Sequence, residues 1–180
     1  MLRQYLSRQL SKFEKQWNYD AGYLRELLAV SPSALIKFQL VSGLGQTPGA
    51  PPEARAAVGI VGTMVEDCGP CTQISVDMAT AGGVDPKVLR AILAGDRQAM
   101  GETAALGYDF AHAVLERRLM DADELRDEIV SRWGQKAVVA LGLTLTTARM
   151  YPTLKYAVGH GKACSRVVVA GEAAPLKLAA

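Results

Sequence analysis

One segment of the chain reads Cys68-Gly69-Pro70-Cys71-Thr72-Gln73-Ile74-Ser75-Val76-Asp77-Met78-Ala79-Thr80-Ala81-Gly82-Gly83. It begins with a Cys-x-x-Cys pair and ends with two glycines, which commonly stop a helix. Between them Ile74, Met78 and Ala81 recur at helical intervals. Pro70 fits the first helical turn, where a backbone N–H has no intrahelical partner. The pattern predicts a helix that starts at the cysteine pair and ends at the glycines.

The spacing of Cys68 and Cys71 predicts a redox pair. Positions i and i+3 of a helix share one face, so the two sulfurs can form a disulfide and reopen it. The unpaired N–H groups and the positive dipole end of a helix favour the thiolate there, and the thiolate is the nucleophilic form. Both cysteines are therefore candidate catalytic residues.

Other interpretations of the pair remain open. Cys68 and Cys71 could combine with His160 and Cys164 as a four-ligand zinc site, although the second pair lies far along the chain. They could also form a permanent structural disulfide, although a bridge over two residues removes almost no loop entropy. Finally, they could be buried cysteines that act only as small apolar residues. A thioredoxin-like fold, with residues 58–62 as the strand before the pair, is the alternative architecture. The lack of a downstream β-hairpin signal argues against that fold.

Composition restricts the classes of protein that the chain can belong to. Its 180 residues suffice for one domain with a proper core, and 49% of them are hydrophobic. A net charge of +2 gives no general attraction to nucleic acid or to anionic membranes. The longest apolar run, 137–145, is too short to span a bilayer. Three cysteines are too few for a secreted disulfide scaffold, and we expect a cytoplasmic protein.

Helical periodicity recurs along the rest of the chain and predicts an all-α fold. We expect a single domain over 1–180, with an N-terminal helical extension (1–50), a core (53–160) and an irregular tail (165–180). The Gly- and Pro-rich residues 43–52 should form a loop. Helices are expected at 2–17, 23–30, 33–42, 54–65, 68–82, 85–93, 99–120, 121–130 and 135–150, with a possible continuation after Pro152 at 153–158.

An all-helical domain with Cys-x-x-Cys at a helix start, followed by a long helix, an acidic turn and a very apolar helix, resembles the carboxymuconolactone decarboxylase and alkylhydroperoxidase D superfamily. The resemblance covers Glu53 to Tyr156, and residues 19–28 resemble the N-terminal extension of its peroxidase-related members. It implies an alkylhydroperoxidase D-like bundle that assembles as a homo-oligomer. It also implies a thiol-dependent peroxidase or disulfide-exchange activity that needs no metal or organic cofactor.

The resemblance also implies an order of attack. Cys71 would attack the peroxide and become a sulfenic acid, which Cys68 would resolve. The position at a helix end favours the other order, with Cys68 as the more exposed and attacking thiol. Both orders remain open at this point.

The chain departs from the redox branch of that superfamily at two relay positions. That branch carries a histidine four residues after the second cysteine, where this chain has Ser75, and an upstream glutamate that would fall near Ala56. A serine hydroxyl can form a hydrogen bond but is no base near neutral pH. Glu66, Asp67 and Asp77 are candidate replacements as proton acceptors. The candidate site is therefore Cys68 and Cys71 with Glu66 and Ser75.

These residues support three functional hypotheses. The first is an oxidoreductase that reduces a peroxide or a disulfide substrate and is regenerated by a thiol reductant. The second is a decarboxylase-like enzyme acting on a lactone or β-keto acid, although the chain has only two histidines to offer as bases. The third is a non-catalytic helical oligomer that binds a small ligand.

We expect a homo-oligomer on physical grounds as well. Two amphipathic N-terminal helices and the apolar helix 135–150 offer more hydrophobic surface than one small bundle can cover. Sedimentation velocity at micromolar concentration should therefore give a species heavier than the 19.2 kDa chain. A monomer in that experiment would contradict the prediction.

Overall fold

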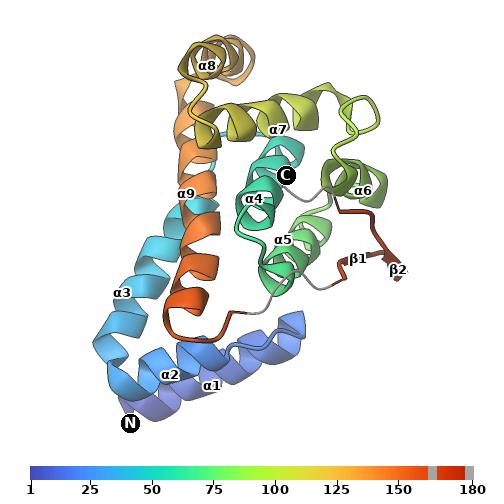
Figure 1. The fold of residues 1–180 in the computed structure, drawn as a ribbon. Coiled ribbons are helices and arrows are strands. Elements are labelled where there is room, and N and C mark those ends of the chain that lie inside the picture. The colour runs from blue at the N-terminus through green and yellow to red at the C-terminus, as the bar shows by residue number, and fades with distance from the viewer. Residues whose placement is uncertain (162–165, 177–180) are drawn as a thin grey trace.

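The structure, a computed structural model, describes residues 1–161 and 166–176 (Figure 1). The described chain is helical, with one short hairpin near its C-terminal end. Its elements are α1 (Leu2–Trp17), α2 (Gly22–Val30), α3 (Pro32–Ser42), the 3-10 helix η1 (Gly43–Gln46), α4 (Pro52–Met64), α5 (Gly69–Ala81), α6 (Pro86–Ala94), α7 (Gly101–Leu115), α8 (Leu119–Trp133), α9 (Gln135–Ala157), β1 (Val168–Val169) and β2 (Glu172–Ala173). The all-α expectation is confirmed at this level of description.

Proline and glycine set many of the helix ends. Prolines occupy the first turns of α3, α4, α5 and α6, where the missing N–H has no cost. Ser31 and Asp85 cap α3 and α6 by accepting bonds from backbone N–H groups at 3.3 and 2.7 Å. Gly83, with φ of +87°, closes α5 through a bond from the N–H of Val84 to the carbonyl of Ala79. The predicted helix stop at the double glycine is thus confirmed.

Helix α4 is the centre of the main hydrophobic core. It packs against α5, α7 and α9, and Figure 1 shows it enclosed by these three helices. Its side chains Val58 and Ile60 are fully buried, and α9 contributes Leu141 to the same cluster. Residues 58–62 lie inside this helix, so the strand required by the thioredoxin-like alternative is absent there.

Helices α1 to α3 form a second hydrophobic cluster. It includes Leu10, Tyr23 and Leu35, all of them buried. Partly buried residues from the last turns of α9, including Tyr151 and Leu154, pack against this cluster. Helix α9 therefore belongs to both clusters and holds the N-terminal extension against the core.

The sequence predicts a helix to residue 150 with a continuation over 153–158 after Pro152, and the structure shows both as one helix, α9, which runs through Pro152 to Ala157. Proline removes one intrahelical hydrogen bond, which normally ends or kinks a helix. Here Pro152 is itself buried, and the turns around it contribute Tyr151 and Leu154 to the N-terminal cluster. Tertiary packing thus compensates for the lost hydrogen bond.

Other predicted boundaries also need correction. Helix α7 stops at Leu115 rather than at residue 120, because Arg117 is left-handed and the N–H of Arg118 bonds back to the carbonyl of Ala113. The predicted loop 43–52 starts with the 3-10 turn η1.

The tail that we expected to be irregular contains the β1–β2 hairpin within its described part. Gln73 on α5 bonds both the N–H and the carbonyl of Val168, and Arg90 on α6 bonds the carbonyls of Val169 and Ala173. These side chains supply hydrogen bonds that so short a hairpin cannot make within itself.

Helices α4 and α7 cross at a glycine, and this contact generates a stability prediction. A Cβ atom at Gly107 would lie 2.6 Å from the backbone oxygen of Ala54 and 2.9 Å from its Cα, so α7 would have to move away. We expect Gly107→Ala to lower the free energy of unfolding by about 1–3 kcal/mol. Chemical denaturation followed by circular dichroism measures the change.

The matched control is Gly142→Ala on α9, where no described atom beyond the neighbouring residues and the backbone of the helix itself lies within 4 Å of the added Cβ. This substitution should leave stability unchanged or raise it by about 0.5–1 kcal/mol, since alanine favours the helix. Equal effects of the two substitutions would show that close packing at Gly107 does not limit the fold.

Candidate functional site

The cysteine pair lies at the start of α5, as the sequence predicts. Cys68 is the N-cap residue of the helix, Cys71 lies in its first turn, and the two are joined by a disulfide across a Cα–Cα distance of 5.2 Å. Pro70 lies between them in the first turn. The sequence reasoning on spacing therefore describes the local geometry correctly.

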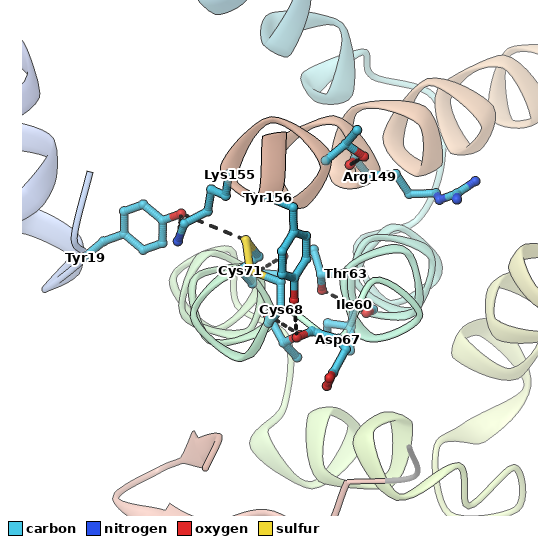
Figure 2. The surroundings of a disulfide bond; sticks show 12 residues. Tyr19, Ile60, Thr63, Asp67, Cys68, Cys71, Arg149, Lys155 and Tyr156 are labelled. Atoms are coloured by element: carbon cyan, nitrogen blue, oxygen red, sulfur yellow. Dashed lines mark hydrogen bonds between the residues drawn. A yellow bond between two sulfur atoms is a disulfide. The ribbon is translucent and has the colours of Figure 1, made fainter. Parts of the chain in front are cut away.

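Both cysteines are buried, with 1% of Cys68 and 2% of Cys71 exposed. The expectation that Cys68 is the more exposed thiol is therefore wrong. The last turn of α9 packs over the turn that precedes the pair, where the hydroxyl of Tyr156 donates to the backbone carbonyl of Asp67 at 2.9 Å (Figure 2). This contact ties α9 to the start of α5.

A pocket of about 400 Å³ reaches the pair from one side. Cys71 is among the described residues that line it, and Cys68 is not. The walls come from α4, α5, α9 and the N-terminal extension, and they are mainly apolar or aromatic. A molecule in this pocket would therefore contact Cys71 rather than Cys68.

Tyr19 and Lys155 lie beside Cys71 (Figure 2). The Tyr19 hydroxyl is 4.0 Å from the Cys71 sulfur, and the Lys155 ammonium donates to the Tyr19 oxygen at 3.1 Å. Only 4% of Lys155 is exposed, and its ammonium lies 4.8 and 5.2 Å from the ring centroids of Tyr19 and Tyr23. Such cation–π contacts partly offset the cost of burying the charge.

The direction of the Tyr19 contact follows from the chemistry of its partners. A disulfide sulfur carries no proton, so within the Tyr19–Cys71 contact the Tyr19 hydroxyl is the donor; the Tyr19 side chain also interacts with Lys155 and with the Tyr23 hydroxyl. Burial raises the pKa of Tyr19 to about 12, which keeps the phenol protonated at neutral pH. In the reduced protein this donor would stabilise a Cys71 thiolate, and the nearby ammonium would act in the same direction.

The other two predicted site residues have different surroundings. The carboxylate of Glu66 pairs with Arg149 on α9, with 2.6 Å between Oε1 and Nε, and Glu66 is not among the described residues that line the pocket. Ser75 does line the pocket, but its hydroxyl donates to the backbone carbonyl of Cys71 at 3.0 Å. The structure therefore brings Ser75 to the cysteine pair and directs Glu66 elsewhere.

Ala56, at the second departure from the redox branch, also lines the pocket. Small side chains, Ser75 and Ala56, thus occupy both positions at which the redox branch of the superfamily that the sequence resembles has its relay residues. Asp77, another candidate proton acceptor, accepts from the Gln73 amide at 2.8 Å. The remaining candidate, Asp67, has a left-handed backbone with φ of +49° and contributes its carbonyl to Tyr156.

The residues of the zinc alternative are not assembled in the described chain. Cys68 and Cys71 are bound to each other, and the His160 ring bonds Glu26 on α2 at 2.7 Å. Cys164 lies outside the described residues. Among residues 1–161 and 166–176, no group of three or more His, Cys, Asp or Glu side chains is placed to hold a metal ion.

Tyr19 and Lys155 are the site residues that sequence reasoning missed. They are separated by 136 positions, and no local pattern links them. The available signal was weak: a lysine in the last turns of a largely apolar helix, and a tyrosine pair, Tyr19 and Tyr23, in the segment that resembles a family extension.

No protein-family model, curated protein or solved structure matches the chain, so the geometry of the site is the basis for its interpretation.

In the part of the chain that the structure describes, none of the helices combines the length and apolarity needed to cross a membrane.

Removing the Tyr19 hydroxyl should raise the pKa of the Cys71 thiol, because the thiolate loses a hydrogen-bond donor. We expect Tyr19→Phe to raise this pKa by about one unit, equivalent to about 1.4 kcal/mol. The measurement is the pH dependence of iodoacetamide alkylation in a Cys68→Ser, Cys164→Ser background, where Cys71 is the one remaining thiol. Lys155→Met should shift the pKa in the same direction.

The matched control is Tyr5→Phe, which removes the hydroxyl of an exposed tyrosine on α1. It should leave the alkylation profile unchanged. If Tyr19→Phe also leaves the profile unchanged, Tyr19 does not act on the thiolate.

Proposed function

We propose that the chain is a thiol-dependent peroxidase, with an alkylhydroperoxidase D-like helical bundle, whose Cys68–Cys71 pair cycles between dithiol and disulfide. One observation carries the proposal. The Cys71 sulfur lines a pocket beside a phenol that accepts a hydrogen bond from a buried ammonium, while its disulfide partner lies behind it. The pocket lining, which includes Cys71 and not Cys68 among the described residues, further supports Cys71 as the attacking residue.

The reaction starts from the reduced pair. The Cys71 thiolate attacks the terminal peroxide oxygen, the O–O bond breaks, and an alkoxide leaves and takes up a proton to become an alcohol. Cys71 is then a sulfenic acid, and the Cys68 thiol attacks its sulfur to form the disulfide and release water. Two thiols of an external reductant restore the dithiol and leave as a disulfide.

Tyr19 and Lys155 would perform the work of the missing relay residues. Tyr19 stabilises the thiolate before attack, and it can donate its proton to the leaving alkoxide. Lys155 holds the Tyr19 oxygen at 3.1 Å and places a positive charge where negative charge develops. Ser75 has no acid–base role in this scheme, because its hydroxyl is bonded to a backbone carbonyl.

Cys68 suits the role of resolving residue and leaving group. When an external thiol attacks Cys71 in the disulfide, Cys68 leaves as a thiolate. Its position as the N-cap of α5 stabilises that negative charge through the helix dipole and the free N–H groups. The same exchange would allow a small disulfide substrate to be reduced.

Ligand binding without turnover is the second candidate function, and the apolar pocket favours it. A decarboxylase-like activity has less support. His112 bonds Glu116 and His160 bonds Glu26, and neither histidine is among the described residues that line the pocket.

The proposal predicts that both cysteines of the pair are needed for catalytic peroxide consumption. With dithiothreitol as the reductant, Cys71→Ser and Cys68→Ser should each reduce the rate to background. Cys164→Ser is the matched control, since it makes the same chemical change at the third cysteine, and should keep the wild-type rate. Wild-type rates in both pair variants would refute the redox proposal and favour ligand binding.

A further inference from the structure

The pocket beside Cys71 is lined by residues spread along α4 and α5. The two helices are joined by residues 65–68 and pack side by side as a hairpin. Arg55 lies near the start of α4 and Thr63 near its end, and both line the pocket. Their separation of eight residues corresponds to about 12 Å along the helix axis. Cys71 lies at the Thr63 end of this hairpin (Figure 2).

The end of the pocket remote from Cys71 carries a positive charge. Arg55 is the one charged side chain among the described residues that line the pocket. One of its guanidinium nitrogens donates to the backbone carbonyl of Gly45 at 3.2 Å and lies 3.5 Å from the Gln46 amide oxygen. Both partners are neutral, and none of the ion pairs among the described residues includes Arg55. A guanidinium with remaining N–H donors is suited to binding a carboxylate.

Between these two ends the pocket is mainly apolar, and small residues line part of it. Ala56 and Gly59 on α4 face the space from one side, and Ser75 and Ala79 on α5 face it from the other. Ser75 has its hydroxyl occupied by a backbone carbonyl, so it offers little to a polar ligand. An apolar chain fits such a passage, because it gains burial without leaving polar groups unpaired.

We infer that the pocket binds an elongated apolar carboxylate, with Arg55 on the carboxylate and the chain extending along α4 and α5 to Cys71. If the protein is the peroxidase proposed above, the substrate is a fatty acid hydroperoxide whose peroxide group lies near the middle of its chain. This part of the inference rests on the proposed function. The overall reaction converts the hydroperoxide and two thiols into a hydroxy fatty acid, a disulfide and water. The distance between Arg55 and Cys71 would select the position of the peroxide along the chain.

Binding can be tested without any turnover. Ricinoleic acid is a hydroxy fatty acid of the product class, and its methyl ester lacks the charge. Calorimetry on the oxidised protein, below the micellar concentration, should show the acid binding more tightly than the ester. Arg55→Met should weaken binding of the acid roughly ten- to a hundredfold, as expected for loss of a charged hydrogen bond, and should not affect the ester. Arg126→Met, at an exposed ion pair on α8, is the matched control.

Turnover supplies the second arm of the test. Linoleic acid hydroperoxide should be reduced with a lower KM than its methyl ester, and Arg55→Met should remove that difference. The comparison of acid with ester in the wild-type protein needs no variant, so it remains decisive if Arg55→Met does not fold.

The outcomes separate the two proposals. Arg55-dependent binding of ricinoleic acid without any peroxide reduction would refute the peroxidase and keep the carboxylate site. Peroxide reduction that is indifferent to the carboxylate and to Arg55 would refute the carboxylate site and keep the peroxidase. Failure of the wild-type protein to distinguish acid from ester in both binding and turnover overturns the inference.

Discussion

The packing of α9 against two separate hydrophobic clusters is the constraint on which the rest of the structure depends. Leu141 anchors its first half in the core around α4, and Leu154 anchors its last turns against α1 to α3. Because the helix continues through Pro152, Lys155 arrives beside Tyr19, and Tyr156 reaches the turn before Cys68. A helix that ended at the proline would lose the contacts of Leu154 with the N-terminal extension, and it would leave the cysteine pair without Lys155 and Tyr156.

The site buries the charged side chain of Lys155 and surrounds it with groups that reduce the free-energy cost of that burial. Placing an ammonium in a nearly water-free environment is expensive, by several kcal/mol after relaxation. Lys155 is compensated in part by the oxygen of Tyr19 and by the faces of two aromatic rings. The same arrangement holds the Tyr19 hydroxyl beside the Cys71 sulfur, so a contact that stabilises Lys155 would also serve the proposed chemistry.

Local signals in the sequence predicted the helix starts, the stop at the double glycine and the position of the cysteine pair, because Pro70, Gly82 and Gly83 act within one turn. They failed where distant contacts decide the outcome. The extension of α9 depends on packing against residues 1–35, and the β1–β2 hairpin depends on Gln73, which lies 95 positions earlier in the chain. Glu66 was assigned to the site by proximity in sequence, whereas its carboxylate pairs with Arg149 on another helix. The Tyr19–Lys155 contact could not be predicted, since nothing local connects its two ends.

The burial of both sulfurs, with Cys71 on the pocket wall, has a kinetic consequence. Cys71 lines the same cavity that, in the proposed reaction, would hold the oxidant. If the reductant reaches Cys71 through this cavity as well, oxidant and reductant occupy it in turn, and each excludes the other while it is bound. An enzyme built in this way follows ping-pong kinetics, and a high concentration of either reactant slows the half-reaction of the other. A folded protein domain is too large to enter such a cavity. A protein reductant would therefore have to reach the disulfide through a thiol on a narrow group.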